Sequence, residues 1–148
     1  MASDSPSPPK WIAQRPSAFD IVAAYYPESE PKGALALRPC LVLDVLQGKT
    51  TGNIACRVAY GTKNLKFSLR KHLDIIVQNS THIDEMGLAM ATRFVLDPED
   101  IIDLPWTTEV FECWEGLAHL KMGTLMETYM RDYAYCMAMR EVNKRGSS

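Results

Sequence analysis

Short apolar segments separated by turn-forming residues make up most of the chain before residue 110. The segments at 19–26, 38–46 and 54–60 are dense in apolar side chains, and proline, glycine or polar residues bound each of them. This pattern is typical of β-strands. The polar stretch between the second and third segments contains Gly48 and Gly52, which predicts a β-hairpin.

Weaker strand signals continue beyond this hairpin, at residues 65–69, 73–77, 91–96 and within 97–106. Residues 80–90 can open with one helical turn, for which Ser80 or Thr81 would supply the N-cap. About five to seven short strands at such close spacing predict a small barrel or sandwich rather than alternating β–α units.

The pattern changes to a helical period after residue 116. Polar residues occupy the opposite side of a stretch in which apolar residues recur at Leu117, Leu120, Leu125, Tyr129, Tyr133, Cys136 and Met137. We therefore expect one amphipathic helix over 117–142. It has no partner helix in the chain, so it must pack on the barrel, on a second subunit or on another protein. The expected fold class is mainly β with α, a small β-barrel with a long C-terminal helix.

The length of 148 residues and an apolar fraction of 47% are those of one globular domain, expected over 16–148. Residues 1–15 are polar and proline-rich and are expected to be a disordered tail. No apolar run reaches the roughly 18 residues of a membrane span. The four cysteines lack zinc-site spacing and are expected to be free, buried thiols, which implies a reducing, cytoplasmic location.

The net charge of −2 hides two strongly charged windows, +6 over residues 49–73 and −7 over residues 96–116. The basic window could be a phosphate-contacting face, which would suit a nucleic-acid partner. On charge alone, a solvated hairpin face that is partly paired with the acidic segment is favoured over a phosphate-contacting face. A wholly basic nucleic-acid binder is excluded.

Motif searches leave one candidate pair. The chain has no phosphate-binding glycine loop, no nucleophile elbow, and no histidine pair at metal-ligand spacing. Arg38 begins the second apolar segment and Thr62 follows the third, and each lies twelve positions from Thr50 in the expected turn. An antiparallel hairpin would thus bring a guanidinium and a hydroxyl together at its open end. Polar residues at strand ends can also be purely structural.

The strings FDIVAAYYPES, LRPCLVLDVL and IACRVAYGTKN, which fall within residues 19–64, resemble the toxins of the MazF/PemK group. This resemblance implies an SH3-like barrel that forms a homodimer. It also implies an endoribonuclease that cuts single-stranded RNA and that an antitoxin protein neutralises by filling the RNA groove. Arg38 and Thr62 match the essential pair of the family.

The residue types fit this implied chemistry. Arginine stays charged and can stabilise the negative charge that develops on phosphorus, while a threonine hydroxyl can position the phosphate. No metal or other cofactor is needed, because the RNA 2′-hydroxyl is the internal nucleophile. Tyr60 or Trp106 could stack on a base or belong to the core. The residues expected to bind RNA phosphates are Lys49, Lys63, Lys66, Arg70 and Lys71.

One departure from the family pattern keeps other functions open. Asp44 stands where many members have a small serine or threonine, and a carboxylate facing the groove would repel RNA. The chain could instead be a non-enzymatic barrel that binds a protein, as an inhibitor or adaptor of a mobile element. A third possibility is a barrel that binds nucleic acid without cutting it. The Met-rich helix could cover the barrel or form a seam with a partner.

Overall fold

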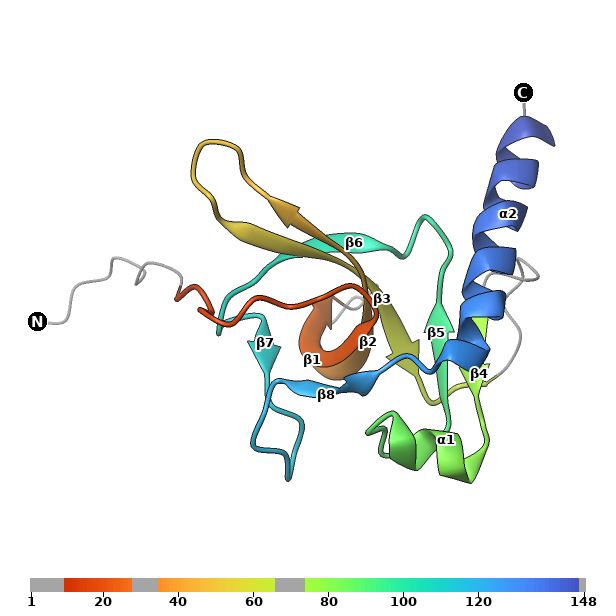
Figure 1. The fold of residues 1–148 in the computed structure, drawn as a ribbon, viewed down its shortest axis with the longest axis horizontal. Helices are drawn as coiled ribbons and strands as arrows, with labels where there is room; N and C mark the ends of the chain where they lie inside the picture. The colour runs from red at the N-terminus through yellow and green to blue at the C-terminus, as the bar shows by residue number, and fades with distance from the viewer. Residues whose placement is uncertain (1–9, 28–34, 66–73, 147–148) are drawn as a thin grey trace, which may run out of the picture.

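The computed structural model describes residues 10–27, 35–65 and 74–146. The elements, in chain order, are β1 (Asp20–Pro27), β2 (Leu35–Gln47), β3 (Ile54–Thr62), β4 (Asp74–Val77), α1 (Ser80–Glu85), β5 (Thr92–Val95), β6 (Ile102–Pro105), β7 (Phe111–Glu112), β8 (Lys121–Thr124), a 3₁₀ turn η1 (Glu127–Tyr129) and α2 (Met130–Gly146). The fold is therefore mainly antiparallel β with a C-terminal helix, as the sequence predicts (Figure 1).

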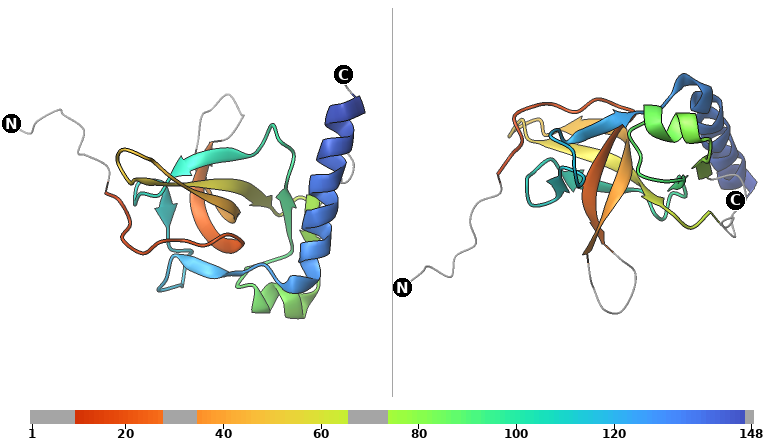
Figure 2. Two further views of the ribbon diagram at one scale, coloured as in Figure 1. Left: turned by 45° about the horizontal axis from the view of Figure 1, so that its top comes forward. Right: turned by 90° about the horizontal axis from the view of Figure 1, so that it is seen from below.

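Three long strands form the centre of one curled sheet. β2 lies between β1 and β3, and its pairing with β3 places Cys40 opposite Tyr60. The outer edge of β3 pairs first with β6 and then with β5, while that of β1 pairs with β8 and then with β7. Because each outer edge is shared by two short strands that diverge, the sheet curls into a half-barrel (Figure 2). The predicted β2–β3 hairpin is present, and the amide of Gly48 donates to the carbonyl of Asn53 across its turn at 2.9 Å.

Both faces of the central strands are buried. Ile21 and Leu41 belong to a cluster that also takes in β4, β5 and α2, whereas Val22 and Val42 belong to a second cluster with β6 and β7. Successive side chains on a strand point to opposite faces, so the two clusters lie on either side of the sheet. This double coverage explains why residues 21–24 and 40–42 are continuously apolar rather than alternating.

The C-terminal helix is shorter than the sequence predicts. α2 begins at Met130, and residues 121–124 of the expected helix 117–142 instead form β8 against β1. A Cβ at Gly123 would lie 2.2 Å from the carbonyl oxygen of Met86, so this strand approaches the end of α1 too closely for a larger residue. The helix packs on the sheet, where Tyr133 meets the ring of Phe19 edge-on at 5.1 Å and Cys136 is buried.

Residues 10–15 of the tail predicted over 1–15 are described by the structure. Trp11 forms a β-bridge with Thr107, and the amide of Ile12 donates to the carbonyl of Trp106 at 3.0 Å. These main-chain bonds tie the segment to the residues that directly follow β6. The remainder of the predicted tail, residues 1–9, lies outside the described residues.

The N-cap of α1 is another correction. The side chain of Asn79, rather than Ser80 or Thr81, accepts the amides of Thr81 and His82. The strand expected over 65–69 falls almost wholly outside the described residues, whereas those expected at 73–77, 91–96 and within 97–106 are confirmed as β4, β5 and β6. Within the described ranges, no helix is long and apolar enough to span a membrane.

Candidate functional site

The two residues singled out by the hairpin spacing line one cleft. Continuing the register that pairs Cys40 with Tyr60 puts Arg38 opposite Thr62 at the open end of the β2–β3 hairpin. Arg38, Thr62 and Lys63 line a cleft of about 160 Å³. A guanidinium, a hydroxyl and an ammonium group thus come from adjacent strand ends to one place.

Gly61 allows the strands to meet closely at this cleft. A Cβ at this position would lie 2.9 Å from the carbonyl oxygen of Pro39 and 2.7 Å from a methyl carbon of Thr92. Gly61 is paired with Phe94 of β5 and is buried. The absence of a side chain therefore brings β2, β3 and β5 together beside the two candidate residues.

An aromatic ring lies beneath the Arg38 guanidinium. The Cζ atom of Arg38 is 5.5 Å from the centroid of the Tyr60 ring, a cation–π geometry. Tyr60 in turn packs on the ring of Tyr26 at 5.0 Å, and the Tyr26 hydroxyl donates to the carbonyl of Asp100. Burial and then the charge of Asp100 raise the pKa of Tyr60. Its phenol therefore stays protonated at neutral pH and acts as a platform rather than as a base.

Hydrogen bonds fix the chain on the other side of the cleft. The Thr62 hydroxyl oxygen accepts the amide of Asn64 at 3.2 Å, which leaves its proton available to donate. The Asn64 carbonyl accepts the Nε of Arg93 at 2.8 Å, and the Nη1 of Arg93 pairs with Asp74 at 3.2 Å. Arg93 and Asp74 are nearly buried, with side-chain exposures of 11% and 8%. This pair was not predicted from the sequence, although a lone arginine within an apolar strand was a signal for it.

The cleft lining also includes large apolar side chains. They are those of Met90, Trp114 and Met122, which come from the loop before β5, the loop before β8 and β8 itself. Trp114 was not predicted from the sequence to lie here. Trp106, for which the sequence leaves both base stacking and the core open, packs in the core at 3% exposure, and its indole N–H donates to the carbonyl of Gln14 at 2.8 Å.

The predicted phosphate-binding residues divide into three groups. Lys63 lines the cleft, and Lys49 is exposed at the tip of the β2–β3 hairpin, away from the cleft-lining residues. Lys66, Arg70 and Lys71 lie outside the described residues. Arg57, also in the basic window, forms a two-point ion pair with Asp103 at 2.9 and 3.2 Å. Basic and acidic windows thus meet at this pair.

Asp44 lies apart from the Arg38 cleft. It is exposed and lines a separate depression with Arg57, between the hairpin and α2. The expected repulsion between this carboxylate and an RNA strand in the groove therefore does not arise from a cleft-lining position.

No histidine lines the cleft, and the described part of the chain holds no cluster of three His, Cys, Asp or Glu side chains suited to a metal ion. Nδ1 of His82 hydrogen-bonds the hydroxyl of Tyr129 at 2.6 Å. Chemistry at the cleft would rest on an arginine, a threonine and a lysine beside large apolar side chains. Comparisons of the chain with protein-family models, with curated proteins and with solved structures give no match.

Proposed function

We propose that this protein is an endoribonuclease toxin of the MazF/PemK type that cuts single-stranded RNA in the Arg38 cleft. The observation that carries the proposal is the convergence of Arg38, Thr62 and Lys63 on one small cleft that Trp114 also lines. Two cations and a hydroxyl suit a phosphodiester, and an indole suits an unpaired base. A double helix would not present its bases to such a cleft.

The proposed reaction is an internal transfer at phosphorus. The RNA 2′-oxygen forms a bond to phosphorus and loses its proton to water, while the bond from phosphorus to the 5′-oxygen breaks. The departing 5′-oxygen takes a proton from water, so the products are a 2′,3′-cyclic phosphate and a 5′-hydroxyl. Arg38 stabilises the charge that develops on the phosphate oxygens, and Thr62 donates a hydrogen bond that holds the phosphate in place.

Tyr60 supports Arg38 in this scheme. A cation over an aromatic face is stabilised by about 0.5–2 kcal/mol, so the ring restricts the guanidinium to the cleft side of β2. No group in the cleft is a typical general base or acid, and the rate enhancement would come mainly from positioning and electrostatic stabilisation.

The test is cleavage of an unstructured RNA by the purified full chain in the presence of EDTA. Wild type should cut, and Arg38→Ala should lose at least about a hundredfold in rate, which is typical for removal of a charge-stabilising group. Thr62→Val should also lose activity, whereas Thr62→Ser should retain most of it because the hydroxyl remains.

Matched control variants at exposed positions of the C-terminal region show whether the loss of cleavage is specific to the cleft. Arg131→Ala and Thr128→Val make the same chemical changes away from the cleft and should cut like wild type. An Arg38→Ala variant that is folded and cuts at the wild-type rate would refute the proposal. Salt-sensitive RNA binding with no cutting would instead indicate a nucleic-acid-binding barrel.

The proposal includes the two partners that the family resemblance implies, an antitoxin protein and a second copy of the chain. An antitoxin whose tail fills the cleft should protect Trp114 from quenching and stop cleavage, and a homodimer should elute at twice the chain mass of 16.6 kDa. A cytoplasmic site of action belongs to the same proposal.

A groove beside α2 favours the second candidate, a barrel that binds a protein. The groove holds about 360 Å³ between the hairpin and α2, and combines Leu43, Ile101 and Met137 with the charged side chains of Asp44 and Arg140. Expression in growing cells distinguishes the two candidates. The toxin should arrest growth and Arg38→Ala should relieve the arrest, whereas a binding module should leave growth unchanged with either chain.

A further inference from the structure

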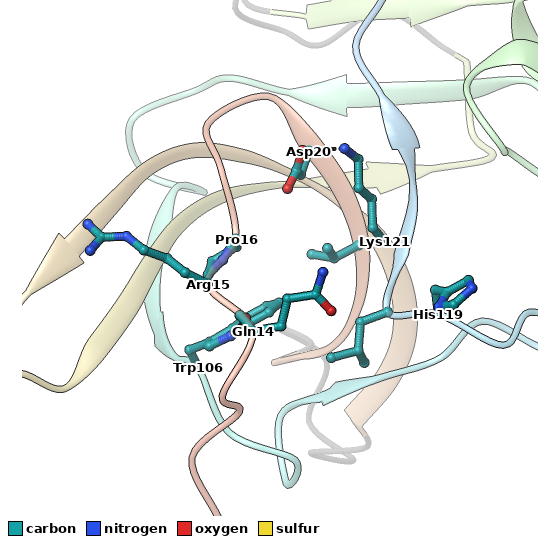
Figure 3. Close-up of a pocket in the computed structure, with 9 residues that line it drawn as sticks. Gln14, Arg15, Pro16, Asp20, Trp106, His119 and Lys121 are labelled. Atoms are coloured by element: carbon teal, nitrogen blue, oxygen red, sulfur yellow. Dashed lines mark hydrogen bonds and ion pairs between the residues drawn. The ribbon is translucent and has the colours of Figure 1, made fainter.

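A second pocket opens between the N-terminal segment and β8. It has a volume of about 270 Å³ and is shown in Figure 3. Its apolar lining comes from Pro16, Val22, Trp106 and Leu120. A flat ring of one or two cycles could lie against this lining, which suits pockets that bind small organic ligands.

Polar groups surround the apolar lining on several sides. The amide of Gln14 reaches toward the middle of the pocket, and His119 and Lys121 stand on the β8 side (Figure 3). An amide offers both a donor and an acceptor to the edge of a heteroaromatic ring. The side-chain donors available to an anion are those of Lys121 and His119, because the Arg15 guanidinium points away from the pocket (Figure 3) and donates to Gln47 at 3.4 Å.

The ammonium group of Lys121 is positioned before any ligand arrives. Asp20 is buried, and its Oδ1 lies 3.3 Å from Lys121 Nζ, while its Oδ2 accepts the amide of Ser17 at 2.9 Å. Lys121 remains half-exposed and keeps donors for a ligand. A fixed cation reduces the ordering that binding must impose.

The backbone at Phe19 turns Asp20 toward this pair. Phe19 has φ of +71°, which a bulky residue rarely adopts. Its amide donates to the carbonyl of Val42 and its carbonyl accepts the amide of Leu125, so both neighbouring strands hold the conformation. The ring of Phe19 therefore packs under α2 while the next residue faces Lys121.

We propose that this pocket binds a nucleotide, with the base against Trp106, Val22 and Leu120 and the phosphate at Lys121 and His119. The shared chemistry is a flat heteroaromatic ring joined to a phosphate, and it could come from a free nucleotide or from one nucleotide of an RNA strand. The second source would extend the proposed function by adding a subsite, but the pocket itself does not depend on RNA cleavage.

The pocket is separate from the Arg38 cleft. Lys121 lines the pocket and the next residue, Met122, lines the cleft, so β8 forms a wall between the two sites. Each site also holds its own tryptophan, Trp106 at the pocket and Trp114 at the cleft. Trp11, the third tryptophan of the chain, lines neither.

The test follows the three indole N–H resonances of the ¹⁵N-labelled full chain by NMR, assigned with Trp11→Phe and Trp114→Phe. Adenosine 5′-monophosphate should shift the Trp106 resonance, and adenosine or inorganic phosphate alone should bind at least about tenfold more weakly. Lys121→Gln should weaken nucleotide binding about tenfold, because it removes a charge-assisted hydrogen bond. The matched control Lys49→Gln changes an exposed hairpin lysine and should bind like wild type.

Gln14→Ala and His119→Ala provide a second test if Lys121→Gln disturbs Asp20. Both side chains are exposed, so their loss should weaken nucleotide binding while the NMR spectrum stays that of the folded chain.

An uncleavable 2′-O-methyl hexa-adenylate distinguishes the two sources of the nucleotide. A joint shift of the Trp106 and Trp114 resonances, with tighter binding than the mononucleotide, indicates an RNA subsite. Tighter binding of the mononucleotide indicates a free nucleotide. The proposal is overturned if millimolar nucleotide leaves Trp106 unshifted, or if none of the three variants weakens binding. Absence of RNA cleavage by the wild-type chain would refute the proposed function and leave this binding result unchanged, so the two proposals fail separately.

Discussion

The four cysteines differ in their exposure to solvent. Cys40, Cys56 and Cys136 are buried, and Cys113, just before the cleft residue Trp114, is partly exposed. Burial raises the pKa of Cys40 and Cys56 to about 12 and that of Cys136 to about 11. The sequence prediction of free thiols is confirmed for all four, and the prediction of burial holds for three.

This difference predicts selective labelling. A thiol reagent such as Ellman's reagent should modify one cysteine of the folded chain quickly and the other three only after unfolding, because the thiolate is the reactive form. Cys113→Ser should remove the fast phase, and the control Cys136→Ser should keep it. Fast labelling of more than one thiol in the folded wild type would contradict the burial described above.

The sequence predicts that Arg38 and Thr62 lie opposite each other, because the two strands of a hairpin pair residues at equal distances from the turn. The pairs nearest the turn, such as Gln47 and Ile54, are centred between Thr50 and Thr51, and the bulge between Val42 and Asp44 shifts the register so that Cys40 and Tyr60 are equidistant from Thr50. Trp114 could not be found in this way. It reaches the cleft through loops and tertiary packing, and no local pattern encodes that placement.

Short elements depend on single capping and packing residues. For α1, the side-chain oxygen of Asn79 accepts two amides, at 2.9 and 3.2 Å. Asn79→Ala should therefore lower the free energy of unfolding by about 1 kcal/mol, as loss of an N-cap does. Ser80→Ala is the matched control and should change stability little. Urea unfolding measures both, and a larger loss in Ser80→Ala would show that the cap lies one residue later.

The contact between α1 and β8 depends on glycine. Gly87 has φ of +70° and a Cβ there would lie 1.9 Å from the carbonyl oxygen of Met122, whereas Gly116 has φ of +86° and open space around it. Gly116→Ala should cost about 1–2 kcal/mol from the left-handed backbone alone. Gly87→Ala should cost about 1–3 kcal/mol more, since overpacking adds to it. Equal losses in urea unfolding would refute the close approach.

The segment 117–129 shows why the sequence misplaced the start of the helix. Leu117, Leu120 and Leu125 fit a helical period, but in the structure they lie on either side of β8, and Leu117 is exposed. Pairing of β8 with β1 and the close approach at Gly123 decide the outcome, and both are long-range contacts. The central strands were predictable because their apolar runs, turns and hairpin are local signals.

At the scale of the whole molecule, buried thiols make stability depend on alkaline pH. The thiol pKa is near 9.0 in the unfolded chain and about 11–12 for the three buried cysteines of the folded chain. Above pH 9 the unfolded chain therefore loses protons that the folded chain keeps, and the free energy of unfolding falls as pH rises. The slope is at most about 1.4 kcal/mol per pH unit for each thiol.

Urea unfolding at neutral pH and near pH 10 measures this effect. The raised pKa of Tyr26 adds to the loss above pH 10 in the same direction. Cys56→Ala should reduce the slope by the share of one thiol, and Cys113→Ala serves as the control at a partly exposed site. Stability that is constant from pH 8 to pH 10 would contradict the burial of these groups.

The two apolar clusters bury both faces of the sheet at its centre, so neither face there contacts solvent. Wherever both faces are covered, any polar side chain would be desolvated without a partner, so each such position tolerates only apolar or very small residues. Arg38 and Thr62 stand where this double cover ends, at the margins of β2 and β3. New chemistry in a fold of this kind can therefore be acquired at the rims and in the connecting loops, while the centre has little freedom to evolve.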